Sequence, residues 1–226
     1  MIGNGEIQMA TGTKGHCYVC GAELGKTAMK NHIHKTHDDP HGAQKCSLLK
    51  IEGAYAKDYW LYIDIPVTAT LSAVDAFLRE IWLECCGHLS AFYGYGRTEV
   101  NPRRKLREFP IGDKLRHEYD FGSTTETLIT IVGETVRKTQ RDAVRLLARN
   151  IPPVFPCPVC GKPAIWLCTE CIYDEGSPFL CDECGEAHEH EDMLLPVVNS
   201  PRMGTCGYEG EMDHFTFYPQ KIVGKT

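Results

Sequence analysis

The 226-residue sequence contains no apolar run that approaches the roughly 20 residues of a membrane-spanning helix. Its first stretch, Met1 to Lys14, is polar and glycine-rich and lacks the apolar centre of a secretion signal. Internal repeats and low-complexity segments are also absent. We therefore expect a protein that is neither secreted nor inserted in a membrane, and that has no membrane partner.

An excess of positive charge is missing as well. The formal net charge is -6 and the isoelectric point is near 5.9, so the surface as a whole does not attract nucleic acid. A glycine-rich phosphate loop, a pair of catalytic carboxylates and a metal site with an open position are not evident either. These absences favour a non-enzymatic protein, and they leave room for a local basic patch.

Cysteine, by contrast, is abundant. Eight of the twelve cysteines fall in four Cys-x-x-Cys pairs, and histidines follow the first and the last pair. This spacing is typical of metal sites rather than of disulfides. Since no secretion signal is present, the expected location is a reducing compartment, the cytoplasm. The four pairs are Cys17/Cys20, Cys157/Cys160, Cys168/Cys171 and Cys181/Cys184.

Changes in composition divide the chain into segments. A polar turn at residues 38–42 and the helix-breaking Asn150-Ile151-Pro152-Pro153 mark two boundaries. We expect a flexible leader over 1–14, a zinc finger over 15–38, a main domain over 46–151, a cysteine-rich module over 152–193 and a C-terminal tail over 194–226.

The main domain is expected to be α+β, with packed helices on a mixed or antiparallel sheet. Apolar residues at three- and four-residue steps predict an amphipathic helix from Leu71 to Cys85, ended by Gly87. Because Leu128 and Ile129 are both apolar, the strand that holds them fits burial on both faces. Residues 142–149 fit a short strand or a short helix. Strands are expected at Tyr59–Val67, Leu89–Tyr95, Leu115–Phe121 and Thr125–Val132, the last two joined by a turn at Gly122-Ser123.

The N-terminal segment has the spacing of a two-Cys, two-His zinc finger. Eleven residues separate Cys20 from His32, and four separate His32 from His37. A helix over Thr27–Lys35 would carry both histidines, and Leu24 and Met29 occupy the positions of the finger's small core. We expect zinc on Cys17, Cys20, His32 and His37, with His34 as an alternative third ligand.

The finger is poorly equipped to read DNA. The helix positions that usually face base edges hold Gly25, Ala28 and Asn31, and the first two have no side-chain hydrogen-bonding group. Lysines at 26, 30 and 35 could touch phosphates, but a solvated face is the favoured interpretation. Any nucleic-acid binding is therefore expected to be sequence-independent.

The C-terminal cysteine-rich segment contains enough ligands for two tetrahedral ions. Its pairs are separated by seven and nine residues, and His188 and His190 follow the last pair after three more. Sequential sites would crowd Cys181, Cys184, His188 and His190 into ten residues, so interleaved sites are favoured. One ion is then expected on Cys157, Cys160, Cys181 and Cys184, and the other on Cys168, Cys171, His188 and His190, which makes three zinc ions in the chain.

This pattern resembles B-box and related cross-braced zinc domains over about forty residues, although Cys160 stands where a B-box often has histidine. The ligand sets look closed, which argues against a catalytic zinc. So short a segment depends on metal for its folding free energy. Cys206 is an alternative ligand here, and a free or buried thiol is an equally good interpretation.

The middle of the chain resembles the plasmid pRiA4b ORF-three-like family over roughly residues 47–136. The resemblance lies in Tyr59-Trp-Leu-Tyr-Ile-Asp-Ile, in the helix ending Trp82-Leu-Glu-Cys-Cys-Gly-His-Leu-Ser-Ala-Phe, and in Tyr119-Asp-Phe-Gly. Some members carry a cysteine-rich extension with a segment like Asn199–Arg202. The resemblance implies an α+β domain and no established activity. The family's Asp and Trp after Tyr-Asp-Phe-Gly are replaced here by residues 123–126.

Two function classes follow from these patterns. The favoured one is a non-enzymatic zinc-binding adaptor for a protein or ribonucleoprotein partner. The other is an enzyme with a site around Asp120 and His88, with Cys85 or Cys86 as nucleophile, although no sequence feature brings these residues together. The basic loop Arg97, Arg103, Arg104, Lys105 and Arg107 has aromatic neighbours and could hold RNA or phosphate, but a solvated loop is favoured.

Overall fold

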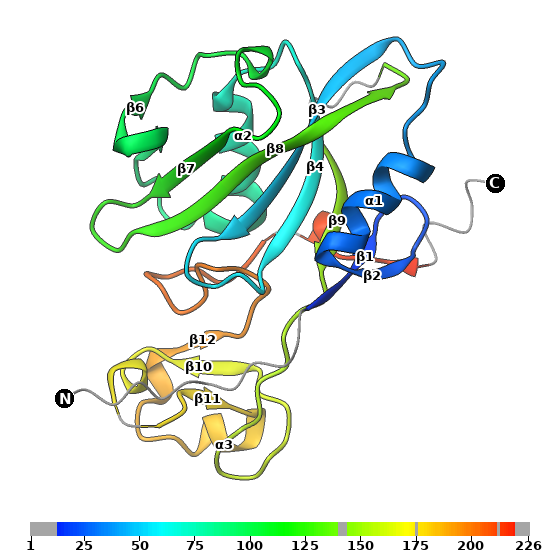
Figure 1. The fold of residues 1–226 in the computed structure, drawn as a ribbon. Helices are drawn as coiled ribbons and strands as arrows, with labels where there is room; N and C mark the ends of the chain where they lie inside the picture. The colour runs from blue at the N-terminus through cyan, green and yellow to red at the C-terminus, as the bar shows by residue number, and fades with distance from the viewer. Residues whose placement is uncertain (1–12, 140–143, 175, 212, 220–226) are drawn as a thin grey trace.

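The computed structural model describes residues 13–139, 144–174, 176–211 and 213–219 (Figure 1). Nearly all of the leader expected over 1–14 lies outside these residues, as do residues 142 and 143 of the segment expected to be a strand or a helix. The described chain is mixed α+β and mostly sheet. It contains a nine-stranded sheet in its larger part and a three-stranded sheet in a smaller part below it (Figure 1).

The large sheet is antiparallel throughout, with the order β2-β1-β9-β4-β3-β8-β7-β5-β6. The small sheet has the order β11-β10-β12 and is also antiparallel. The strands of the large sheet are β1 (Lys14–Cys17), β2 (Glu23–Gly25), β3 (Gln44–Gly53), β4 (Trp60–Pro66), β5 (Ser90–Tyr93), β6 (Glu99–Val100), β7 (Lys114–Tyr119), β8 (Thr125–Arg137) and β9 (Arg145–Asn150). Those of the small sheet are β10 (Trp166–Cys168), β11 (Phe179–Leu180) and β12 (Leu194–Pro196).

Two helices cover opposite faces of the central strands. Successive side chains of a strand point to opposite faces. In β4, Leu61 and Ile63 pack with the helix α2 (Leu71–Leu78), whereas Trp60 and Tyr62 pack with α1 (Lys26–Thr36). Six consecutive residues of β4 are buried for this reason. The strand predicted at Tyr59–Val67 is therefore confirmed as a central strand of the sheet.

The burial expected for the strand containing Leu128 and Ile129 was wrong. Buried and less buried residues alternate along β8, and Leu128 remains half-buried. Leu128 lines an open pocket beside residues 93–97, so only the other face of this end of β8 is fully buried. The predicted pairing of this strand with its predecessor is confirmed, since β7 and β8 are joined through residues 120–124. The segment after 144 forms β9, so the strand alternative holds there.

The predicted amphipathic helix exists but changes its winding. It is α-helical from Leu71 to Leu78, continues as a π-helix over Arg79–Leu83, and ends before Cys85. Wider π turns shift the direction of the chain that follows and often occur at functional sites. Here the turn leads directly into Cys85-Cys86-Gly87-His88.

The segment after the small sheet returns to the large part of the molecule. Ser200 Oγ donates to the carbonyl of Trp82 at 2.7 Å. Asn150 Nδ2 donates to Asn199 Oδ1 at 2.7 Å, and Asn199 Nδ2 donates to the backbone carbonyl of Asn150 at 3.1 Å. Arg202 is fully buried against the large sheet. We call residues 199–208 the return segment. It also contacts the small part, because Met203 packs against the apolar cluster that contains Leu167 and Gly204 lies close to the same leucine. The strand β12 just before it belongs to the small sheet.

Within the described residues, the helices are all too short or too polar to cross a lipid bilayer.

Candidate metal centres

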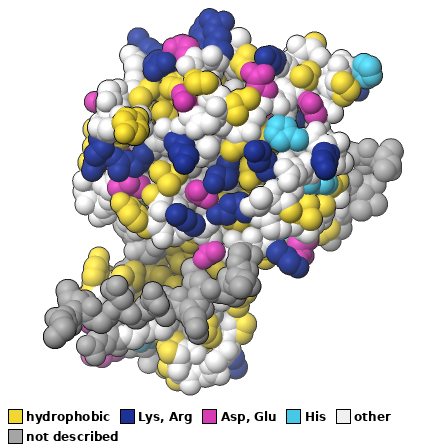
Figure 2. Space-filling view, in the orientation of Figure 1, with side chains coloured by type: hydrophobic (Ala, Val, Ile, Leu, Met, Phe, Trp, Pro, Cys, Tyr) yellow, Lys and Arg dark blue, Asp and Glu magenta, His cyan; other side chains and the backbone are white. Residues whose placement is uncertain are grey.

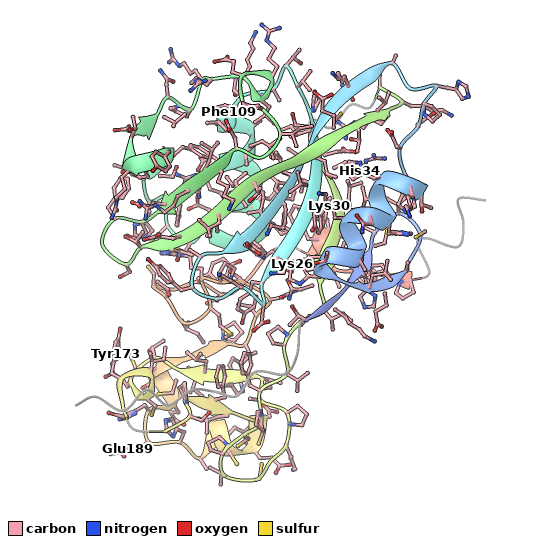
Figure 3. All side chains as sticks on the ribbon, in the orientation of Figure 1. Lys26, Lys30, His34, Phe109, Tyr173 and Glu189 are labelled. Atoms are coloured by element: carbon pink, nitrogen blue, oxygen red, sulfur yellow. The ribbon has the colours of Figure 1, made fainter. Side chains whose placement is uncertain are left out.

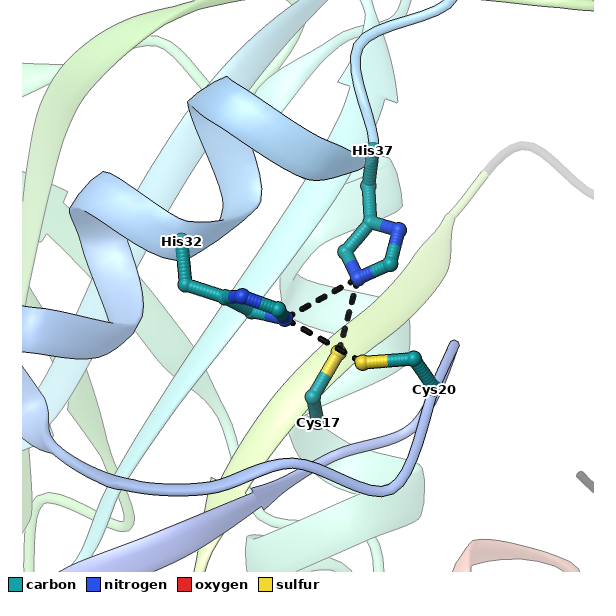
Figure 4. Close-up of side chains that lie close together, drawn as sticks. All are labelled: Cys17, Cys20, His32 and His37. Carbon is teal, nitrogen blue, oxygen red and sulfur yellow. Dashed lines mark hydrogen bonds between the residues drawn. The ribbon is translucent and has the colours of Figure 1, made fainter.

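The N-terminal set lies between a hairpin and a helix. Cys17 and Cys20 flank the turn after β1, while His32 and His37 lie on and just after α1 (Figure 4). Cys17 Sγ is 3.3 Å from His37 Nε2, Cys20 Sγ is 3.2 Å from His32 Nε2, and the two ring nitrogens are 3.1 Å apart. All four ligand atoms lie within 4.8 Å of one another, so this set could hold one metal ion.

A tight turn brings two of the cysteine pairs together. The N–H of Gly21 donates to the carbonyl of Cys17 at 2.8 Å, and Gly161 makes the same bond to Cys157 at 2.9 Å. Both glycines have a positive φ, of 79° and 76°, which glycine adopts at little cost. The local sequence Cys-x-x-Cys-Gly therefore predisposes two thiols to point at one ion.

His34, the alternative third ligand, lies elsewhere. Its ring packs on Gly133 of β8, where an added Cβ would come within 2.4 Å of Cε1. Lys26, Lys30 and His34 follow one another along the side of α1 that runs over the sheet (Figure 3). Lys26 Nζ donates to Glu52 Oε2 at 2.8 Å and to the carbonyl of Lys57 at 2.7 Å. This lysine therefore fastens the helix to the sheet.

The C-terminal cysteine pairs are grouped in the interleaved order. The first and third pairs form one set, comprising Cys157, Cys160, Cys181 and Cys184, and the second pair joins the two histidines in another, comprising Cys168, Cys171, His188 and His190. Cys160 Sγ is 3.4 Å from Cys181 Sγ. Cys171 Sγ is 3.3 Å from His188 Nε2 and 3.7 Å from His190 Nδ1. Each set could hold one metal ion.

A thin apolar core accompanies these two sets. Phe155 and Phe179 stack with ring centroids 3.9 Å apart, and Leu167 and Ala164 complete the cluster. Such a cluster buries little apolar area for a segment of about forty residues. This part of the chain is therefore expected to depend on bound metal for its folding free energy.

The surroundings of the ligands shift their pKa values in both directions. Burial lowers the pKa of His37, with the neighbouring His32 and Arg145 acting in the same direction, so the ring is held in the neutral form that binds metals. Backbone N–H groups, first that of Cys181, lower the pKa of Cys157 to about 6. Burial raises the pKa of Cys17 to about 11, so an ion bound there must displace a proton.

A fourth group of ligand atoms lies outside the predicted sets. It contains Cys85, Cys86 and His88, from the turn after the π-helix, together with Cys206 of the return segment. Cys206 thus lies with this group and apart from the C-terminal module's ligands. The local Cys-Cys-Gly-His run was visible in the sequence, but no pattern links it to a cysteine 120 residues further on.

The residues of the alternative enzyme site also come together here. His88 Nδ1 lies 3.5 Å from Asp120 Oδ1, and Cys86 Sγ lies 2.9 Å from His88 Nε2. Asp120 accepts the backbone N–H groups of Gly122 and Ser123, as a turn residue does, and also the guanidinium of Arg202 at 2.8 Å.

The basic loop borders a pocket of about 690 Å³ at the far edge of the large sheet. Tyr95 at its rim is fully exposed, and Arg104 lies over the ring of Phe109, labelled in Figure 3, at 4.5 Å. Carboxylates partner several of the cations: Arg97 and Arg116 both contact Glu118, and Arg104 contacts Glu108. Lys and Arg side chains are spread over the visible face of the larger part with Asp and Glu among them (Figure 2).

No protein-family model and no curated protein matches this chain. Among solved structures, it is similar to the protein of unknown function MM3350 from Methanosarcina mazei Go1. The identity is 15% and the TM-score 0.41, over 47% of this chain and 69% of that one.

Proposed function

We propose that this chain is a non-enzymatic zinc-binding adaptor that presents its surface to a protein or ribonucleoprotein partner in the cytoplasm. The observation that carries the proposal is the composition of the three predicted ligand sets. Each holds four cysteine or histidine side chains whose ligand atoms lie within 4.8 Å of one another. A zinc ion with four protein ligands has no open position for water or substrate, and such sites are structural.

Zinc fits these donors better than other common ions. The thiolate and imidazole ligands exclude magnesium and calcium, which prefer oxygen. Two sulfurs about 2.3 Å from a tetrahedral zinc are about 3.7 Å apart. The Cys184–Cys160 separation of 3.8 Å agrees with that spacing. We also propose that all twelve cysteines are kept as thiols or thiolates in a reducing compartment, since each is free of a disulfide.

The main domain is proposed to belong with the pRiA4b ORF-three-like proteins, on the motifs that carry the resemblance. The N-terminal finger extends the large sheet through β1 and β2, whereas the C-terminal module has its own sheet. The two zinc-binding parts lie at different places on the molecule in Figure 1, so both add to the surface available to a partner.

The surface proposed for a nucleic-acid component is the pocket beside the basic loop. Tyr95, with its ring fully exposed, can stack on an unpaired base, and Arg97 and Lys114 beside it can contact phosphates. Neither group reads a base edge, so binding there would be independent of sequence. The carboxylates around the pocket keep such binding weak unless a protein partner adds contacts.

The alternative function is an enzyme that uses Cys86 as nucleophile, His88 as base and Asp120 to orient the histidine. The 2.9 Å and 3.5 Å contacts between them favour it. The thiols of Cys85 and Cys206 lie close to the same group. They weigh against an enzyme, since a cysteine nucleophile needs only one thiol beside its base.

A pull-down of the full chain from native cells tests the proposal. Recovery of a defined partner would support it. A ribonucleoprotein partner should be lost when the sample is treated with nuclease, and a protein partner should be retained. The matched control is the Cys168→Ala chain, which should lose any partner held by the C-terminal module. Covalent trapping of Cys86 by a substrate-like electrophile, with no stable partner recovered, would favour the enzyme instead.

A further inference from the structure

Three thiols and one imidazole meet where the return segment lies on the end of the π-helix. Cys86 Sγ is 3.7 Å from Cys85 Sγ, 3.7 Å from Cys206 Sγ and 2.9 Å from His88 Nε2. Cys206 Sγ is 3.6 Å from the same ring nitrogen. The four ligand atoms lie within 4.8 Å of one another although the chain separates Cys86 and Cys206 by 120 residues.

Most of these separations match the edges expected for ligands around a tetrahedral zinc ion. With zinc–sulfur bonds of about 2.3 Å and zinc–nitrogen bonds of about 2.0–2.1 Å, sulfurs lie about 3.7 Å apart and sulfur lies about 3.6 Å from nitrogen. Three of the four measured separations agree with these values, and the Cys86–His88 contact is shorter. A disulfide would need sulfurs about 2.05 Å apart, so the thiols are not poised as a bonded pair.

We infer that Cys85, Cys86, His88 and Cys206 form a further zinc site, beyond the three sets on which the proposed function rests. The chemical class of ligand is a borderline-soft divalent cation, for which three thiolates and one imidazole are a closed structural set. Cys86 and Cys206 are exposed, so an ion can reach them from solvent.

Neighbouring groups orient these ligands as they do in metal sites. Zinc-binding histidines usually hold their second ring nitrogen against a carboxylate, which fixes the tautomer and directs the other nitrogen at the ion. Asp120 faces His88 Nδ1 in this way. The buried Arg202 guanidinium lies 3.4 Å from Cys85 Sγ, where its positive charge favours the thiolate.

The backbone supports the same conclusion. Cys206 has a φ of 55°, a conformation that costs free energy for a residue with a side chain. Gly87, between Cys86 and His88, has a φ of 78°, like the glycines that follow Cys20 and Cys160. A bound ion would supply the stabilisation that holds Cys206 in this conformation.

The site would fasten the return segment to the large sheet. The chain enters the C-terminal module after residue 151 and leaves it before residue 199. An ion bound to Cys206 would fix the second of these two connections to the large sheet. The site thus has a structural role in positioning the module relative to the large sheet.

Native mass spectrometry of the full chain, purified from zinc-supplemented cells, tests the inference. Wild type should carry one more zinc ion than Cys86→Ala/Cys206→Ala, which retains only two of the four ligands. Cys46→Ala is the matched control, because Cys46 belongs to none of the four clusters, and it should carry as many ions as wild type. Equal zinc content in wild type and the double variant would overturn the inference and leave the other three sets untouched.

Alkylation of the wild-type chain gives a second measurement that needs no variant. Peptide mass spectrometry after iodoacetamide treatment should find Cys86 and Cys206 protected, and a chelator should speed their alkylation by roughly tenfold or more. Fast alkylation of Cys86 before chelation would overturn the inference in favour of a free catalytic thiolate. A Cys86–Cys206 disulfide, seen as a mass loss of two hydrogens, would overturn it as well.

Discussion

Arg202 offers the sharpest test of how the return segment is held. Its side chain has no exposed surface, and its guanidinium donates to Asp120 Oδ2 at 2.8 Å and to Thr125 Oγ1 at 3.0 Å. The same group lies 4.8 Å from the ring centre of Tyr119. Arg202→Ala removes all of these contacts and leaves the Asp120 carboxylate, which is 7% exposed, without its cation.

The expected loss follows from the burial of this pair. Removing one partner of a buried ion pair costs about 3–5 kcal/mol, because the remaining charge stays desolvated. Asp120 keeps two backbone N–H donors, so the lower end, about 3 kcal/mol, is expected. For a chain of this size, that loss lowers the melting temperature by about 6–12 °C.

Urea unfolding at constant free zinc, followed by circular dichroism, measures this loss. The matched control is Arg97→Ala, which removes an arginine that is 70% exposed and bonded to Glu118. Exposed pairs contribute about 1 kcal/mol or less, so this variant should unfold close to wild type. If Arg202→Ala were no more destabilising than Arg97→Ala, the return segment would not be anchored by its buried arginine.

Three other predictions concern the module, the basic loop and the acid stability of the sheet. Cys168→Ala leaves one C-terminal set with three ligands, and it should lower hydrogen-exchange protection across residues 154–196 only. If protection were also lost in β4 and α2, both parts would unfold as one unit. Any nucleic-acid affinity should fall steeply with salt, and Arg103→Ala, in the basic loop, should reduce the slope for a single strand by about 0.7 if that residue contacts a phosphate; discrimination between duplex sequences at fixed salt would count against this interpretation. Burial alone would raise the pKa of Asp75, but hydrogen bonds from His117, Ser90 and Arg79 lower it to about 2. The ionised carboxylate therefore stabilises the fold at pH values above the pKa that Asp75 has in the unfolded chain. After allowance for solvent screening at a side chain that is 19% exposed, this contribution is about 1 kcal/mol; the unfolding free energies of wild type and Asp75→Asn should therefore converge as pH falls from about 4 to about 2, and a constant difference across that range would refute the assignment.

The sequence was most informative where ligands are close along the chain. The spacing of Cys17, Cys20, His32 and His37 sufficed to predict a set whose atoms meet in space, because one hairpin and one helix carry all four. The interleaved C-terminal grouping needed only the argument that ten residues are too few for a separate site. Both arguments use short-range geometry.

Long-range contacts account for what was missed. Cys206 joins Cys85 and Cys86 only after the chain has passed through the whole C-terminal module, and no local pattern encodes that return. The strand β3, central to the sheet, was not predicted, since residues 46–49 are buried without alternation and its partners β4 and β8 lie further along. The π turn at Arg79–Leu83 interrupts a helical periodicity that continues in the sequence.

The count of zinc ions bound by the purified chain tests the central claim most directly. Native mass spectrometry under non-denaturing conditions should find at least three ions per wild-type chain, and the Cys17→Ala/Cys20→Ala variant should carry one fewer. The three predicted sets account for three of these ions, whatever the state of Cys206. A wild-type chain that carries one ion or none, while folded by circular dichroism, would contradict the account.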